Sequence, residues 1–286
     1  MIRVFVPPNP VCGFLRGVSE GLFPASLGFQ LITTDPGSAD VLLASHFGDA
    51  QHQPLAGAVV FFDGESGSSY SASRDAPLTA AYRADVYIGP RANHSVLRNR
   101  GIVCEYVPFA SLSFGERQTH TPLDLVSRPL IQKPLDVSLC GYLASNAVPA
   151  REAFFDQLVL AAANEGQVVR ALGQCAGSLG RPVCETRRFQ DGWIDEAVRL
   201  LSQCRFAMAF ENENIDGYVT EKLVNAYLAG CIPLYSGSSA AFEIFNRDSI
   251  VYIDDFKSPA AAAKYVVQVA KDERECARLL LSLIHI

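Results

Sequence analysis

Short apolar segments alternate with segments of helical periodicity along the chain, and this alternation limits the fold more than any other feature. Continuous apolar runs bounded by Gly, Pro, Ser and Asp are typical of strands that are covered on both faces. In the first half, strands are predicted at Ile2–Val6, Phe29–Ile32, Val41–Ala44, Ala58–Phe62, Val86–Ile88 and Ile102–Val107. Strands that alternate with helices indicate parallel α/β sheets.

The second half repeats the pattern more clearly. Strands are predicted at 136–140, 206–210, 232–235 and 250–253, and helices from Pro149, over 193–203, after Thr220 and over 260–270. Pro149 fits the first turn of a helix, where its missing N–H has no intrahelical partner to lose. Gly230 is placed to end the helix that follows Thr220.

A polar segment with three prolines, 111–134, separates the two halves and is predicted to be a linker. We therefore predict an α/β protein with two Rossmann-like domains, at 1–130 and 131–280. The last six residues, 281–286, resemble the translation of an adaptor used in sequencing, so we exclude them from the fold and expect the natural chain to continue. A plain apolar tail is the alternative.

Composition excludes several classes of protein. The 286 residues are 49% hydrophobic, which is enough for a globular core, and the formal net charge of -6 argues against a nucleic-acid partner or a polybasic membrane binder. No apolar run is long enough to span a bilayer. The eight cysteines form no C-x-x-C pair and no zinc spacing, so we expect reduced thiols in a cytoplasmic protein. A further C-terminal region could place it at a membrane surface.

The segment Phe210–Lys222 has the features of an anion site. A predicted buried strand ends in a polar loop, and the loop runs into the start of a helix. Ligands bind at the carboxyl ends of strands in such sheets, and helix N-termini favour phosphate. Lys222 in the first turn opposes the helix dipole unless an anion lies nearby. The alternative is an ordinary first-turn acid, Glu221, beside a solvated Lys222.

Three consecutive segments resemble the α1,3/α1,4-fucosyltransferases, glycosyltransferase family 10. They are Phe210–Asn212, Tyr218–Leu223 and Ala229–Gly237. The resemblance continues in register through Phe245-Asn246, Ser249-Ile250 and Asp255-Phe256. Shorter matches lie at Ala144–Asn146 with Arg151, and at Phe61–Ser66. The rest of the first half matches only in general layout.

The resemblance implies a GT-B fold, in which two Rossmann-like domains face a cleft. It implies an inverting enzyme that transfers L-fucose from GDP-fucose to a hydroxyl of an N-acetylglucosamine-containing glycan, in α1,3 or α1,4 linkage. The first domain would bind the acceptor, an oligosaccharide similar to N-acetyllactosamine, and the second the donor. No tightly bound cofactor and no essential metal are expected.

The resemblance also implies roles for individual residues. Glu65 falls at the position of the catalytic carboxylate, which takes the proton of the acceptor hydroxyl. Its alternative is a loop acid in a Gly/Ser-rich turn. Arg151 and Lys222 match positions that contact the donor phosphates. The alternative for Arg151 is a solvent-facing residue early in an amphipathic helix. Glu221 matches a carboxylate that contacts the donor sugar and can steady positive charge on it.

Four further residues are expected in the donor pocket: Ser145, Asn146, Asn212 and Tyr218. Glu213 stands where a serine usually follows Phe-Glu-Asn in the family. Because acids near GDP would repel it, we expect Glu211 and Glu213 to face away from the phosphates. The pair Asp254-Asp255 is interpreted as a solvated strand end rather than a metal site.

Two other functions are compatible with the sequence. One is the same fold with another GDP- or UDP-sugar as donor, and the other is a catalytically defective homologue that binds a glycan or a nucleotide. Hydrolases are disfavoured because the sequence contains no G-x-S-x-G elbow, no P-loop and no H-E-x-x-H motif.

Overall fold

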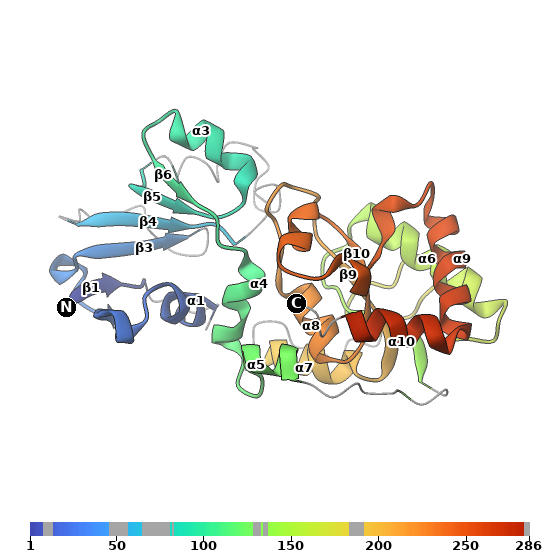
Figure 1. Ribbon diagram of the computed structural model, residues 1–286. Helices are drawn as coiled ribbons and strands as arrows, with labels where there is room; N and C mark the ends of the chain where they lie inside the picture. Colours follow the sequence, from blue (N-terminus) through green and yellow to red (C-terminus); the bar gives the residue numbers. More distant parts are fainter. Residues whose placement is uncertain are drawn as a thin grey trace. The chain divides into compact units, whose positions relative to one another are not determined.

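The computed structural model describes residues 1–7, 14–45, 57–64, 81, 83–127, 133, 137–182 and 192–282. Its contacts divide the chain into two compact units (Figure 1). The first unit comprises Met1–Glu116 together with Glu213–Thr220, and the second comprises Arg117–Asn212 together with Glu221–Ile286. Each unit contains one parallel sheet with helices packed against it.

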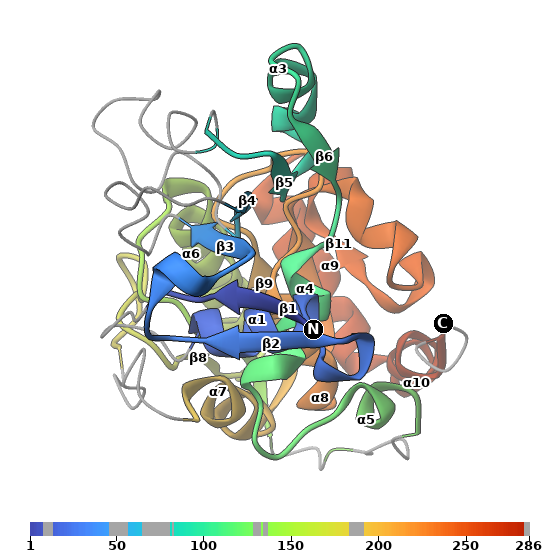
Figure 2. The same ribbon diagram turned by 90° about the vertical axis from the view of Figure 1, so that its left-hand side faces the viewer.

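The sheet of the first unit has six parallel strands. They are β1 (Ile2–Phe5), β2 (Phe29–Ile32), β3 (Val41–Ser45), β4 (Ala58–Phe62), β5 (Val86–Ile88) and β6 (Val103–Glu105). Their order is β2-β1-β3-β4-β5-β6, which can be followed from bottom to top in Figure 2. The helices of this unit include α1 (Phe14–Leu22), α3 (His94–Arg98) and α4 (Phe109–Leu112).

Strand β4 is covered on both faces, as its uninterrupted apolar sequence predicts. Phe62 packs with Leu43 and with Leu112 of α4, whereas its neighbour Phe61 packs with Tyr87 and with residues of α3 on the other face. Successive side chains of a strand point to opposite faces, so two adjacent phenylalanines serve two separate clusters. The first unit therefore has a helix-covered sheet of the Rossmann type.

The sheet of the second unit has five parallel strands. They are β7 (Ser138–Tyr142), β8 (Val169–Ala171), β9 (Cys204–Phe210), β10 (Ile232–Ser236) and β11 (Val251–Tyr252), in the order β11-β10-β9-β7-β8. The first strand, β7, therefore lies between β8 and β9. From β7 the chain moves first to one side of the sheet and then to the other, so β7 and β9 flank a topological switch point.

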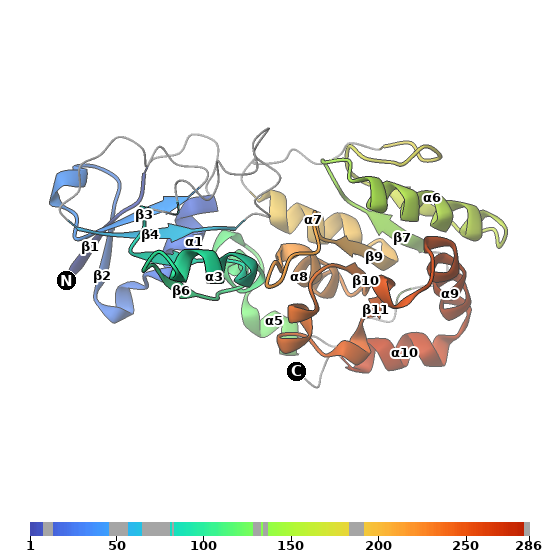
Figure 3. The same cartoon turned by 90° about the horizontal axis from the view of Figure 1, so that it is seen from above.

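Helices cover both faces of this second sheet. Figure 3 shows α6 (Pro149–Ala163) and α9 (Pro259–Lys271) on one side of the strands, with α7 (Trp193–Leu201) and α8 (Glu221–Leu228) on the other. The short helix α5 (Pro122–Ser127) packs on α8, and α10 (Glu273–Leu281) packs on α9. No helix among the described residues is long and apolar enough to cross a membrane.

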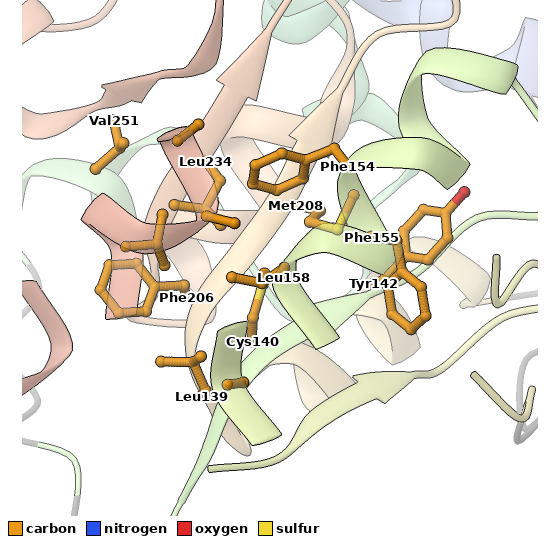
Figure 4. Packing of buried hydrophobic residues seen from close by; sticks show 14 of the residues in the cluster. Leu139, Cys140, Tyr142, Phe154, Phe155, Leu158, Phe206, Met208, Leu234 and Val251 are labelled. Atoms are coloured by element: carbon orange, nitrogen blue, oxygen red, sulfur yellow. The ribbon is translucent and has the colours of Figure 1, made fainter. Parts of the chain in front are cut away.

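The largest core cluster lies between this sheet and the pair α6 and α9. Phe154, Phe155 and Leu158 of α6 are fully buried and pack with Phe206 of β9 and Leu234 of β10 (Figure 4). Complete burial of a side chain of this size contributes about 1.5–3 kcal/mol. Because α6 begins directly after the β7 loop, this packing also fixes the residues of its first turn.

The strand predictions agree closely with the structure, and β2, β4 and β5 have the predicted bounds. The strand β8 was not predicted because its three residues form no distinguishable apolar run. The prediction of a linker at 111–134 was wrong for part of the segment. Ser113–Glu116 forms a turn of 3-10 helix, and Pro122 opens α5, since proline is tolerated in the first turn.

The contacts divide the chain after Glu116, earlier than the predicted boundary at residue 130. The physical reason lies in Asp195 at the start of α7. Its carboxylate accepts hydrogen bonds from the backbone N–H groups of Gln118 (2.7 Å) and Thr119 (3.0 Å), and it pairs with His120 Nδ1 at 2.9 Å. These bonds attach the segment after Glu116 to the second unit.

The cysteines that the structure describes are all buried, and none of these six forms a disulfide. Asn93, in the sequon Asn-His-Ser, donates a hydrogen bond from its side-chain amide to the Tyr87 hydroxyl at 3.1 Å. The amide nitrogen that a glycan would occupy is therefore engaged inside the first unit.

The packing of α6 predicts that truncation of Leu158 lowers the free energy of unfolding much more than truncation of Leu160. Leu158→Ala should destabilise the second unit by about 2–5 kcal/mol, because it leaves a cavity in a fully buried cluster. Leu160→Ala removes the same atoms from the same helix, but the Leu160 side chain is 50% exposed. Its loss of unfolding free energy should therefore be well below about 1 kcal/mol. Denaturant titration monitored by the single tryptophan, Trp193, measures both. Equal losses would contradict this assignment of the core.

Asp195 predicts a pH-dependent contribution to stability. Burial alone would raise the pKa of its carboxyl, but hydrogen bonds from His120, Gln118 and Thr119 lower the pKa below its usual value. A lowered pKa stabilises the fold above the unfolded-state value and loses that effect as the pH falls through the folded-state value.

We therefore expect Asp195→Asn to unfold at a lower urea concentration than the wild type at pH 7, and the difference to shrink below about pH 4. Trp193 fluorescence, at pH 7 and pH 3.5, provides the measurement. A difference that stays constant between the two pH values would contradict the role of the carboxylate charge.

Candidate functional site

The candidate site lies at the carboxyl ends of β7 and β9. These two strands are neighbours in the sheet, with parallel pairing from Ser138 with Cys204 to Gly141 with Ala207. Ligands of doubly wound sheets bind at this switch point, where the loops after the two strands diverge. The loop after β7 leads into α6, and the loop after β9 leads towards α8. The polar residues of both loops are therefore brought together.

Arg151, in the first turn of α6, is buried, with only 4% of its surface exposed. One terminal nitrogen, Nη2, donates to the Phe210 carbonyl at 2.8 Å and to Asn212 Oδ1 at 2.9 Å, and the other, Nη1, donates to the Asn146 carbonyl at 3.3 Å. The interpretation of Arg151 as a solvent-facing helix residue is thus wrong.

The charge of Arg151 is not neutralised by these contacts. All three partners are neutral oxygen atoms. Among the described residues, the buried Nε–H has no hydrogen-bond partner. A buried cation with an unused donor is unfavourable unless an anion completes its surroundings. The arrangement therefore favours an anionic ligand beside Arg151.

Lys222, the second residue of α8, lies between two carboxylates. Its Nζ is 3.0 Å from Glu211 Oε2 and 3.8 Å from Glu221 Oε1, and its side chain is 22% exposed. Burial lowers the pKa of Lys222, Glu211 and Glu221 raise it by more, and Arg151 opposes them, so that the net pKa lies above its usual value. Lys222 is therefore charged, and it is not the solvated surface residue of the alternative interpretation.

Glu211 has a buried carboxylate that contacts Lys222, the residue that the resemblance assigns to phosphate binding. The expectation that Glu211 faces away from the phosphates stays a prediction. The absence of a side chain at Gly237 leaves room for the Glu211 side chain. A Cβ atom on Gly237 would lie 2.7 Å from Glu211 Cγ, closer than real contacts allow.

The other predicted donor-pocket residues differ in their surroundings. Ser145 is half-buried and Asn146 is exposed, and Asn146 contributes its backbone carbonyl to Arg151. Asn212 is half-buried and accepts from Arg151, so Asn146, Arg151 and Asn212 form one hydrogen-bonded group. Glu221 belongs to the same site through Lys222.

Tyr218 is buried in the segment Glu213–Thr220, whose contacts belong to the first unit. There the Ala92 N–H donates to the Asp216 carbonyl at 3.2 Å, and the Ala110 N–H donates to the Val219 carbonyl at 3.0 Å. Tyr218 is thus described with the first unit, whereas Asn212 and Glu221 on either side of the segment belong to the second.

Glu65 lies outside the described residues. Two residues before it, the buried Asp63 follows β4 and accepts a hydrogen bond from the Tyr87 hydroxyl at 2.8 Å. Gly89 permits this arrangement, since a Cβ there would lie 2.7 Å from the Tyr87 hydroxyl and 2.8 Å from Asp63 Cβ.

No group of His, Cys, Asp and Glu in the described ranges has an arrangement that could hold a metal ion. Asp254 and Asp255 have separate partners. Asp254 accepts a hydrogen bond from Ser236 Oγ at 2.7 Å, and Asp255 forms an ion pair with Arg247.

Sequence reasoning missed Glu152, the neighbour of Arg151. Its carboxylate accepts from the Tyr142 hydroxyl at the end of β7 and, at 2.6 Å, from the Gly177 N–H in the loop after β8. It thereby joins the loops after two neighbouring strands. An acid in the first turn of a helix that follows a predicted strand was the available signal, but its partners are distant in sequence.

The chain is similar in sequence and in fold to known proteins. Residues 142–280 match the family model described as glycosyltransferase family 10 (fucosyltransferase) C-term. The alpha-(1,3)-fucosyltransferase FucT of Helicobacter pylori is 35% identical over 134 residues, which cover 46% of this chain and 25% of that protein. The 4-galactosyl-N-acetylglucosaminide 3-alpha-L-fucosyltransferase 9 of Mus musculus is 41% identical over 79 residues, which cover 27% of this chain and 22% of that protein.

The chain thus spans about a quarter of the length of the curated relatives it matches. Crystal structures of an alpha1,3-fucosyltransferase, with GDP and with GDP-fucose, resemble it with TM-scores of 0.62 and 0.61. At 21% identity, over 98% of this chain and 81% of theirs, they show a shared fold. The predicted α/β class with two Rossmann-like units, GT-B, is confirmed. Residues 142–280, close to half of the chain, therefore match the C-terminal region of glycosyltransferase family 10, the fucosyltransferases.

Proposed function

We propose that the protein is an inverting fucosyltransferase that moves L-fucose from GDP-fucose to a hydroxyl of an N-acetylglucosamine-containing glycan, in α1,3 or α1,4 linkage. The observation that carries the proposal is Arg151, a buried cation at the β7/β9 switch point whose three partners are neutral. A diphosphate is an anion whose oxygens a guanidinium binds through charge-assisted hydrogen bonds. The names of the relatives, and a related fold solved with GDP-fucose, support the choice of donor and acceptor.

The proposed reaction is a single displacement. The acceptor oxygen forms a bond to C1 of fucose from the face opposite to GDP, and the bond from C1 to the β-phosphate oxygen breaks. Its electron pair leaves with GDP, so negative charge develops on the diphosphate. Arg151 and Lys222 stabilise this charge as it forms. Because the protein supplies two cations, the proposal requires no metal ion.

Carboxylates have two roles in the proposal. Glu65 accepts the proton that the acceptor hydroxyl loses, and this role rests on the family resemblance at Phe61–Ser66. Glu221 contacts the donor sugar and steadies the positive charge that develops on its ring. Ser145, Asn146, Asn212 and Tyr218 complete the donor pocket.

Two measurements test the proposed function. Isothermal titration should show binding of GDP in preference to UDP, and incubation with GDP-fucose and N-acetyllactosamine should yield a fucosylated product, with EDTA leaving the rate unchanged. Binding of UDP without GDP would indicate another nucleotide sugar as donor. Binding of GDP with only free fucose, or with no product, would indicate a catalytically defective homologue.

Replacement of the buried guanidinium should weaken nucleotide binding. Arg151→Lys keeps the positive charge but loses the planar fork that reaches Phe210 and Asn212, so we expect the Kd for GDP to rise about 10- to 100-fold, or about 1.4–2.8 kcal/mol. Arg199→Lys on the exposed face of α7 is the matched control and should leave the Kd unchanged. Isothermal titration gives both values. Wild-type affinity in Arg151→Lys would remove Arg151 from the phosphate site.

Replacement of the proposed base, Glu65, should lower kcat without changing the affinity for GDP. Glu65→Gln removes the group that accepts the proton but leaves the cations of the second unit intact, so GDP affinity should stay near the wild-type value while kcat falls about 100-fold or more. Titration with GDP and a transfer assay give the two quantities. Undiminished transfer would show that the proton goes to another group.

A further inference from the structure

Glu211 is more deeply buried than Glu221, the other carboxylate that contacts Lys222. It follows the last residue of β9 and extends the strand pairing, because its N–H donates to the Ser236 carbonyl at 2.9 Å. Its side chain has no exposed surface. A carboxylate in such a place is strongly unfavourable without a cation, and Lys222 at 3.0 Å is that cation. The position of the lysine and the charge of the glutamate therefore depend on each other.

The chain around Gly237 fixes the Glu211 side chain. A Cβ on Gly237 would lie 2.7 Å from Glu211 Cγ and 2.8 Å from the Tyr235 hydroxyl. Two phenols hold this turn, since Tyr252 donates to the Gly237 carbonyl at 2.8 Å and Tyr235 donates to the Ser238 carbonyl at 3.2 Å. The Glu211 side chain therefore packs against the turn at Gly237, and its carboxylate contacts Lys222.

The two cations of the site differ in their charge balance. The three oxygen partners of Arg151 are neutral, whereas Lys222 faces the carboxylates of Glu211 and Glu221. A phosphate that contacts Lys222 therefore also comes close to Glu211, and their like charges repel each other. Glu211 both orients the lysine and opposes the anion.

We propose that Glu211 is a positioning residue that fixes the Lys222 ammonium at the strand ends and limits the affinity of the site for a nucleoside diphosphate. This inference rests on the proposed function for the identity of the nucleotide. The same carboxylate that orders the lysine keeps the product nucleotide from binding too tightly, which favours its release after each transfer.

The variant Glu211→Gln separates the effect of the Glu211 charge from its role in holding the Lys222 ammonium. The amide keeps an oxygen that can accept from Lys222, in a side chain of nearly the same shape, but it removes the negative charge. GDP should therefore bind roughly tenfold more tightly than to the wild type, since the repulsion is lost while the lysine keeps an acceptor. Glu165→Gln removes the same charge beyond the far end of α6 and should leave the Kd unchanged.

Isothermal titration with GDP and, in parallel, with UDP measures these affinities. Unchanged or weaker binding by Glu211→Gln would overturn the proposal, and so would an equal gain in Glu165→Gln, because that would be a net-charge effect. If the wild type binds UDP instead of GDP, the proposed donor is wrong, and the comparison of Glu211→Gln with the wild type is then made with UDP. A wrong nucleotide and a wrong role for Glu211 therefore give different results.

A stability cycle tests the positioning role without any nucleotide. Lys222→Met leaves the Glu211 carboxylate buried without this ion pair and should lower the Tm of the second unit. Adding Glu211→Gln to Lys222→Met should restore much of the loss, because the charge that needed the lysine is gone. Trp193 fluorescence follows both transitions. A double variant whose loss equals the sum of the single losses would overturn the dependence of the two residues on each other.

Discussion

The hydrogen bond from Arg151 to the Phe210 carbonyl is the contact on which the candidate site depends. It joins the first turn of α6 to the last residue of β9, two segments that are 59 residues apart in sequence. Phe210 is the last residue of β9, and the buried guanidinium, which has several donors, satisfies its carbonyl while it also binds Asn212. Together with the bonds from Arg151 to the Asn146 carbonyl and to Asn212 Oδ1, this contact joins the loops after β7 and β9.

Packing and polar contacts reinforce each other in this region. The fully buried Phe154, Phe155 and Leu158 fix α6 on the sheet, and the helix carries Arg151 and Glu152 to the strand ends. Glu152 binds Tyr142 and the Gly177 N–H, so the first turn of α6 contacts the chain after β7, β8 and β9. A rigid hydrophobic layer thus places the charged groups, which suits a site that must hold them before a ligand arrives.

Sequence patterns predicted the parts that depend on local periodicity. The apolar runs of β2, β4 and β5 gave their bounds, and Pro149 gave the start of α6. Strand β8 has a charged residue, Arg170, at its centre and therefore forms no apolar run. The prolines in 111–134 concealed α5 because proline is compatible with both a loop and a helix start. The order of strand, loop and helix also predicts an anionic ligand at the end of β9.

Partners of charged side chains could not be predicted in the same way. Several acids follow β9, and nothing in their spacing shows that Glu211 rather than its neighbours reaches Lys222. That choice depends on Gly237, 26 positions further along the chain, which leaves room for the side chain. The burial of Arg151 likewise depends on the end of β9, so the sequence left a solvent-facing residue as an alternative.

The assignment of Glu213–Thr220 to the first unit has a consequence for how the chain folds during synthesis. The first unit is otherwise complete at Glu116, but the bonds of Ala92 and Ala110 to this segment can form only after residue 220 has left the ribosome. By then β7, β8 and β9 have also been made. The two units therefore cannot mature strictly one after the other, and a chain cut after Glu116 would lack part of the first unit's own packing.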